Sequence, residues 1–163
     1  MKPMIVVPYD FSAASRNALA WAAELHRATG GPPIRLIHTI DPLAGGTPEM
    51  LAVTIPTEDE LRKFEALLAE AAVEERVEAT AEILVRSGSP GSVILEAIRE
   101  LGCDLIVMGT HGRTGVRRLL LGSVAEHVVR HADCPVVTVR GPQHADRLNA
   151  HLASAEADAA SGA

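Results

Sequence analysis

The sequence contains very few aromatic residues: one tryptophan, one tyrosine and two phenylalanines among 163 residues. Proteins that bind single-stranded nucleic acid draw much of their affinity from rings on which bases stack, so this class is not indicated. Basic residues are also in the minority, because 15 lysines and arginines face 21 aspartates and glutamates and leave a net charge of −6. A general attraction to DNA or anionic lipid is therefore absent, and any anion must be bound by a local arrangement of groups.

Cysteines and long apolar stretches are scarce as well. Cys103 and Cys134 are too few for a disulfide-rich secreted scaffold. Each precedes a predicted strand, which leaves a disulfide open, although we expect two reduced thiols. The apolar stretch Met4–Val7 is interrupted by Pro8 and Asp10 and is too short for a signal-peptide core, and no run approaches the ~20 residues that span a bilayer. We therefore expect a soluble cytoplasmic protein.

Five short apolar segments rich in β-branched residues alternate with segments of helical periodicity. The spacing predicts strands over Met4–Tyr9, Ile34–Ile40, Val77–Val85, Asp104–Met108 and Pro135–Arg140. Helices are expected from Asp10 or Ser12 to Gly30, from Thr57 in a capping box with Glu60, from Ser89 and Pro90 to Gly102, and from Ser123 to about Ala132. This alternation predicts an α/β domain with an open parallel five-stranded sheet, order 3-2-1-4-5, and helices on both faces.

The predicted strand order has a consequence for the position of a ligand. It places the first and fourth strands side by side, and the chain order reverses between them. A crevice opens at the carboxyl ends of the strands at such a point. Asp10 follows the first strand and Gly109 follows the fourth, so we expect both at this crevice.

Two regions lie outside the alternation. Asp41–Thr57, rich in proline and glycine, is predicted to be a loop of a length that is often functional. Residues 141–163 have little to bury, so we expect residues 1–140 to form one domain and the alanine-rich remainder to be a disordered tail. Leu148 and Leu152, four residues apart, leave a short helix open as the alternative.

Glycines punctuate the segment after the fourth predicted strand. The pattern is Gly109-Thr110-His111-Gly112, then nine residues, then Gly122-Ser123, with cationic side chains at Arg113, Arg117 and Arg118. Glycine permits a close approach of backbone to ligand. The second pair opens a helix, whose first N–H groups lack internal partners and attract phosphate. Spacing alone leaves two interpretations open: a phosphate-binding loop, or a surface turn capped by Ser123.

The pattern Gly-x2-Gly-x9-Gly-Ser after an apolar strand resembles the ATP-binding signature of universal stress proteins. The stretch MGTHGRTGVRRLLLGSVAEHVVRHADCPVVTVR is similar to that family almost throughout. The opening IVVPYDFSAAS resembles its first strand and Asp-x-Ser turn, and VRSGSPGSVILEAIRELGCDLIVMG resembles its third helix and fourth strand. The resemblance covers Met1 to Arg140. It implies a Rossmann-like fold of the adenine nucleotide alpha hydrolase-like type, usually dimeric, with ATP and Mg²⁺ in the crevice.

The resemblance also implies a set of nucleotide-binding residues. Asp10 matches an acidic position near the ribose and the metal-associated phosphates, and it could contact Mg²⁺ that arrives with ATP. Thr39 falls where backbone groups meet adenine, at a position that is commonly valine. The remaining positions are Pro8 and Tyr9 before the aspartate, Met108, Gly109, His111, Gly112 and Arg113 beside the ribose and α-phosphate, and Gly122, Ser123 and Val124 at the β- and γ-phosphates.

The implied function is that of a nucleotide-dependent sensor or regulator in a stress response, acting on a downstream protein. Two alternatives remain: slow ATP hydrolysis or nucleotidyl transfer, with Asp10 holding a metal and His111 moving a proton, or an interaction module that needs no nucleotide. The sequence has no P-loop, no Gly-x-Ser-x-Gly elbow and no His-Glu-x-x-His motif. We expect no nucleic acid or membrane partner.

The last predicted strand is a candidate interface, and three histidines are candidate metal-binding or structural residues. Val136–Val139 would be an apolar sheet edge with unpaired backbone groups, and the resemblance implies that a second copy pairs with it to form a homodimer. His127 and His131 have a spacing that can bind a metal, but lack an evident third ligand, so we expect an exposed helix face. His38 is expected to be a half-buried structural residue.

Overall fold

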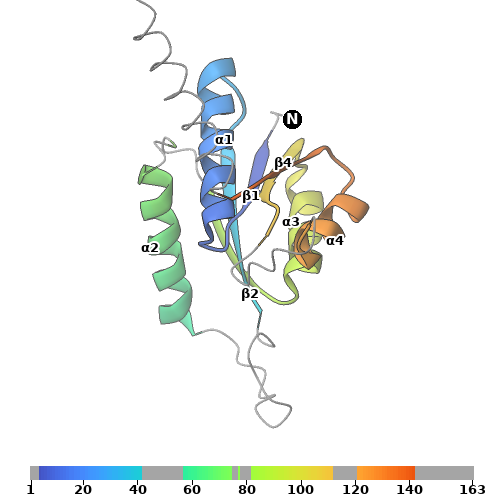
Figure 1. The fold of residues 1–163 in the computed structure, drawn as a ribbon. Coiled ribbons are helices and arrows are strands. Elements are labelled where there is room, and N and C mark those ends of the chain that lie inside the picture. The colour runs from blue at the N-terminus through green and yellow to red at the C-terminus, as the bar shows by residue number, and fades with distance from the viewer. Residues whose placement is uncertain (1–3, 42–56, 75–76, 78–81, 112–120, 142–163) are drawn as a thin grey trace, which may run out of the picture.

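Five strands and four helices alternate along the residues that the computed structural model describes, which are 4–41, 57–74, 77, 82–111 and 121–141. The elements are β1 (Ile5–Pro8), α1 (Ala13–Thr29), β2 (Ile34–Ile40), α2 (Glu58–Glu74), β3 (Glu82–Ser87), α3 (Pro90–Leu101), β4 (Leu105–Gly109), α4 (Ser123–His131) and β5 (Val136–Val139) (Figure 1). Most of the predicted loop and the whole predicted tail beyond Gly141 lie outside these residues, including Leu148 and Leu152.

The strands form a single parallel sheet in the order β3-β2-β1-β4-β5, which confirms the predicted fold class. Ile5 of β1 is the register partner of both Ile34 on β2 and Leu105 on β4. The chain order therefore reverses between β1 and β4, as predicted. β5 lies at one edge of the sheet and β3 at the other.

The boundaries of β2 agree with the prediction, but those of β3 do not. The sequence pattern predicts a strand from Val77, whereas β3 covers Glu82–Ser87. The Val77 N–H donates to the carbonyl of Ala72 at 2.9 Å, so Val77 closes the end of α2. Its side chain is buried in the core. The apolar residue that was expected to start a strand therefore packs beneath a helix end instead.

Local capping signals set the ends of the helices. The Ser12 hydroxyl accepts the N–H of Ser15 at 3.1 Å, and α1 ends at Gly30, whose φ of 57° is left-handed. The predicted capping box of α2 is confirmed, because the Glu60 carboxylate accepts the Thr57 N–H at 2.8 Å and the Glu60 N–H reaches the Thr57 hydroxyl at 3.3 Å.

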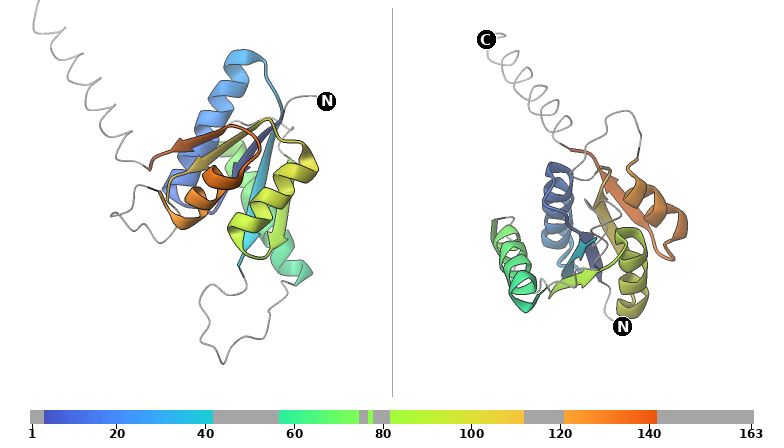
Figure 2. Two further views of the ribbon diagram at one scale, coloured as in Figure 1. Left: turned by 90° about the vertical axis from the view of Figure 1, so that its right-hand side faces the viewer. Right: turned by 90° about the horizontal axis from the view of Figure 1, so that it is seen from below.

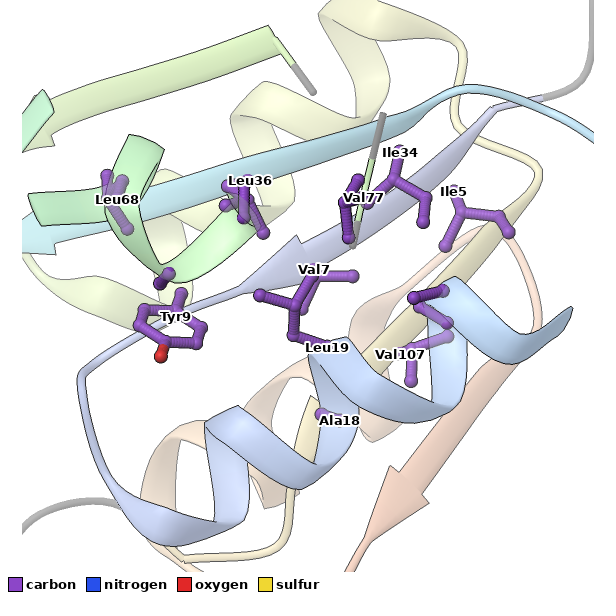
Figure 3. Packing of buried hydrophobic residues seen from close by; sticks show 14 residues of the cluster. Ile5, Val7, Tyr9, Ala18, Leu19, Ile34, Leu36, Leu68, Val77 and Val107 are labelled. Atoms are coloured by element: carbon purple, nitrogen blue, oxygen red, sulfur yellow. The ribbon is translucent and has the colours of Figure 1, made fainter. Parts of the chain in front are cut away.

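Apolar side chains from the helices cover both faces of the sheet. α1 and α2 lie on one face, and α3 and α4 lie on the other (Figure 2). On the first face, Leu19 and Leu68 are fully buried against Val7 and Leu36 of the strands (Figure 3). Every residue of β1 is buried, so the centre of the sheet is anchored from both sides. None of the described helices is long and apolar enough to cross a membrane.

The two cysteines are free thiols and half-buried, and both pack against the core on the α3 and α4 face. The Cys103 thiol donates to the carbonyl of Leu105 at 3.2 Å. Burial, followed by the neighbouring Cys134 thiol, raises the pKa of Cys103 to about 12. Burial also raises the pKa of Cys134. A thiol that stays protonated at neutral pH is a poor nucleophile, which favours a structural role for both.

Candidate functional site

A cavity of about 380 Å³ opens at the carboxyl ends of β1, β2 and β4. Its volume falls in the range of about 300–1,000 Å³ that is usual for small-molecule sites. It lies where the strand order reverses, which is where open α/β sheets bind ligands. Every predicted site residue that the structure describes lines this cavity: Pro8, Tyr9, Asp10, Thr39, Met108, Gly109, His111, Gly122, Ser123 and Val124.

Part of the predicted glycine-rich loop lies outside the described residues. Gly112 and Arg113, two of the predicted site residues, fall there, as do Arg117 and Arg118. The two ends of that loop are described, however. Met108, Gly109 and His111 lie at the start of the loop, and Gly122 lies at its end. Both ends of the loop therefore line the same cavity.

Asp10 sits in a tight turn between β1 and α1. One oxygen of its carboxylate accepts the N–H of Ser12 at 3.1 Å, and Ser12 in turn caps α1. Phe11 between them has a φ of 64°, a left-handed conformation that is uncommon for a residue with a side chain. The turn holds the Asp10 carboxylate at the wall of the cavity, close to the amino end of a helix.

Gly109 is required for packing. A Cβ atom at Gly109 would lie 2.8 Å from the Cβ of Ala14 and 3.0 Å from the backbone nitrogen of Ser15. β4 therefore runs directly against the first turn of α1, at a distance that only glycine allows. The sequence analysis assigned this glycine to backbone freedom and ligand approach. The structure adds that it brings the β1–α1 turn and the end of β4 together.

The amino end of α4 lines the cavity, and its N-cap residue has no side chain that could cap the first N–H groups. Gly122, not Ser123, is the N-cap residue, so the expected capping by Ser123 is wrong. The Gly122 N–H donates to Thr110 at 2.7 Å, which ties the helix start to the end of β4. The N–H groups of Ser123, Val124 and Ala125 have no acceptor within the helix, as at every helix start. All three residues line the cavity.

Two histidines line the cavity in different ways. His111 is half-buried, and its Nδ1 lies 3.0 Å from the Thr110 hydroxyl. His38 is buried, and its Nδ1 lies 2.7 Å from the carbonyl of Tyr9, which agrees with a structural role. His127 and His131 lie side by side on α4, with ring centroids 4.5 Å apart and planes tilted by 35°. Within the described part of the chain, no three His, Cys, Asp or Glu residues gather as a metal site would require.

Sequence reasoning missed several residues of the cavity wall. They are Ser15, Ile37, His38, Ile40, Asp41, Phe64, Pro90, Ile94, Thr110 and Ala125. Six of the ten lie within two residues of a predicted site residue along the chain, so a wider window would have included them, whereas Ser15, Phe64, Pro90 and Ile94 lie farther away. Phe64 is different, because its place in α2 gives it the periodicity of a core residue. Only the packing of α2 brings this ring to the cavity.

The amino-acid sequence is similar to a known protein family and to several of its members. The family model described as the universal stress protein family matches residues 3–140. A universal stress protein of Methanocaldococcus jannaschii is 33% identical over 147 residues, which cover 85% of this chain and 82% of that protein. The matched residues include every described strand and helix.

Solved structures agree in fold. Universal stress protein UspA from Lactobacillus plantarum has a TM-score of 0.65 and 27% sequence identity, over 85% of this chain and 98% of that one. The universal stress protein from Archaeoglobus fulgidus in complex with dAMP has a TM-score of 0.57 and 27% identity, over the same shares of the two chains. Sequence and architecture thus point the same way, and the chain belongs to the universal stress protein family, whose model matches residues 3–140.

Proposed function

We propose that this protein binds ATP in the cavity between β1 and β4 and acts as a nucleotide-dependent sensor or regulator in the cytoplasm. One observation carries the proposal: a carboxylate, Asp10, and the uncapped first turn of α4 line the same cavity. These groups suit the two polar parts of a nucleotide, because a carboxylate accepts from ribose hydroxyls and helix amides donate to phosphate. The relative from Archaeoglobus fulgidus in complex with dAMP supports an adenine nucleotide as the ligand.

The cavity has a direction that fits an extended nucleotide. In our proposal the phosphates lie at the α4 end, against Gly122, Ser123 and Val124, with His111 beside them. The ribose lies against Asp10 at the centre, and the base lies at the β2 end, where Thr39 offers its backbone groups. Gly112 and Arg113 are proposed to complete the phosphate end.

Mg²⁺ fits this site only as a companion of the nucleotide. Mg²⁺ prefers about six oxygen ligands and commonly takes them from phosphates, water and one or two carboxylates. Among the described residues, Asp10 is placed to supply a carboxylate, and Asp41 also lines the cavity. The ion would supply charge neutralisation for the phosphates, and these carboxylates would orient its water shell.

Binding rather than turnover is the proposed activity. A general base needs a partner that orients it and a reach of about 3 Å to its proton. One oxygen of the Asp10 carboxylate accepts from the Ser12 N–H, and His111 Nδ1 lies 3.0 Å from the Thr110 hydroxyl, so both side chains are held at the cavity wall. A switch that senses nucleotide needs only the binding that these groups offer.

The proposal is tested first by the ligand that the native protein carries. The protein is purified without added nucleotide and gently denatured, and the released small molecules are identified by mass spectrometry. Isothermal titration calorimetry with Mg-ATP then measures the affinity and stoichiometry of the stripped protein. We expect a co-purifying adenine nucleotide and one site per chain. A stripped protein that takes up no adenine nucleotide would contradict the proposal.

A further inference from the structure

Aromatic side chains are scarce in this chain, yet most of them gather at one place. Tyr9, Phe11 and Phe64 form an aromatic cluster with the imidazole of His38. The Phe64 and His38 rings are stacked, with centroids 4.7 Å apart and planes 30° from parallel. Phe11 lies edge-on to His38 at 5.0 Å and to Tyr9 at 5.2 Å. Three of the four Trp, Tyr and Phe residues of the sequence belong to this cluster.

The cluster lies at the end of the cavity opposite α4. His38 is on β2 and Phe64 is on α2, and both line the cavity. β1 separates β2 from β4 in the sheet, so Asp10 lies between the aromatic cluster and the α4 amides. The cavity is therefore polar at one end, with helix N–H groups, and aromatic at the other.

Phe64 is the most exposed of the three cluster residues that line the cavity. His38 and Tyr9 are buried, with 7% and 3% of their surface exposed, whereas Phe64 is half-buried. Of the described residues of α2, Phe64 alone lines the cavity. One face of its ring is supported by the His38 imidazole, which the Tyr9 carbonyl holds in place at 2.7 Å. The ring is thus pre-organised, and a ligand would lose little entropy in ordering it.

We propose that Phe64 is a specificity-determining residue of this cavity and selects nucleotides with a purine base. This inference rests on the proposed nucleotide function. When the phosphates are held by the α4 amides and the ribose by Asp10, the base points toward the aromatic cluster. The two fused rings of a purine extend farther than the single ring of a pyrimidine and bury more apolar surface against Phe64. The preference for a purine base is therefore set by a residue of α2, a helix outside the glycine-rich segment.

The test measures affinity for Mg-ATP and Mg-CTP by calorimetry on the full chain, wild type and three variants. Phe64→Ala removes the ring, Phe64→Tyr restores one, and Leu67→Ala is the matched control, because Leu67 lies on the same helix, 39% exposed and outside the cavity wall. Phe64→Ala is expected to weaken ATP binding by about tenfold, the usual size of one base–ring contact. CTP binding should weaken by a smaller factor than ATP binding, because the single ring of cytosine buries less apolar surface against Phe64. Phe64→Tyr and Leu67→Ala should bind ATP as the wild type does.

Two results would overturn the inference while the proposed function stands: a Phe64→Ala protein that binds ATP as tightly as wild type, or one that loses ATP and CTP affinity equally. Wild-type protein that binds neither nucleotide would overturn the proposed function itself. If Phe64→Ala does not fold by circular dichroism, Phe64→Leu keeps the apolar volume without the ring. That variant should lose more ATP affinity than CTP affinity, and unchanged ATP affinity would equally overturn the inference.

Discussion

At the scale of single residues, the backbone of Phe11 shows how the cavity is built. Its φ of 64° lies in the left-handed region, which costs a residue with a Cβ roughly 1–2 kcal/mol. The ring packs against Tyr9, His38 and Phe64. The result is the turn that holds the Asp10 carboxylate at the cavity wall. Strained residues of this kind are often found at functional sites.

The strain at Phe11 can be measured by comparing two truncations. Phe11→Ala and Phe11→Gly both remove the ring, but only glycine adopts this backbone conformation without cost. Phe11→Gly is therefore expected to retain about 1 kcal/mol more unfolding free energy than Phe11→Ala. Urea denaturation of the two variants beside the wild type gives the difference. Equal stabilities, or a less stable glycine variant, would show that the left-handed backbone carries no strain.

At the scale of elements, α2 begins with a capping box that responds to pH. The backbone N–H of Thr57, followed by its hydroxyl, holds the pKa of Glu60 below its ordinary value. A carboxyl whose pKa is lower in the folded state stabilises that state above its unfolded pKa. The contribution is lost as pH falls through the folded pKa. The start of α2, and with it the helix that carries Phe64, should therefore loosen in acid.

An NMR titration of the Glu60 carboxyl tests this capping. The pKa of Glu60 is expected below its ordinary value in the wild type and closer to it in Thr57→Ala. That substitution removes the hydrogen bond from the hydroxyl and leaves the one from the backbone N–H. The pKa of Glu60 should therefore return only part of the way to its ordinary value. A Glu60 pKa that is the same in both proteins would mean that the hydroxyl contributes nothing to the cap.

Local signals account for the elements that the sequence predicted correctly. β2 was predicted over Ile34–Ile40, as observed, because a β-branched run is bounded by Pro33 on one side and Asp41 on the other. The capping box of α2 and the proline at the start of α3 are likewise local. The position of the cavity could be predicted from the strand order. When β1 and β4 are neighbours in a parallel sheet, their carboxyl ends lie side by side, and the cavity lies there.

Contacts between distant segments account for what the sequence did not predict. Val77 was expected in a strand but completes the end of α2 through its bond to Ala72. Gly109 is needed because β4 packs directly on Ala14, which no local pattern records. Phe64 reaches the cavity only through the packing of its helix on the sheet. In each case tertiary packing decides the role of a residue whose local pattern was ambiguous.

At the scale of the whole molecule, β5 is an edge strand with three half-exposed valines and the exposed Thr138. An apolar edge of this kind offers unpaired backbone groups to another strand. We propose that a second copy covers it to form a homodimer. The Pro135 carbonyl accepts from Ile106 of β4, and the Val139 carbonyl accepts from Thr110 just after β4. By strand alternation, the backbone groups of Thr138 therefore point outward.

Thr138→Pro is therefore expected to convert a dimer to a monomer, because proline removes the outward N–H and is tolerated on an edge strand. Light scattering at micromolar concentration should give twice the mass of one chain for the wild type and one mass for this variant. Thr138→Ala keeps the N–H and serves as the matched control, which should remain dimeric. A wild-type protein of single-chain mass would refute the proposed dimer.

The convergence of Asp10 and the α4 amides on one nucleotide is tested most directly at Gly122. Its φ of −71° and ψ of 157° suit any residue, so an aspartate can take this N-cap position. The new carboxylate would accept from the first-turn amides and repel phosphate, whereas Gly122→Ala leaves the amides open. In calorimetry with Mg-ATP, we expect Gly122→Asp to bind at least about tenfold more weakly than Gly122→Ala, with a Tm no lower. Equal ATP affinity in the two variants would contradict the account.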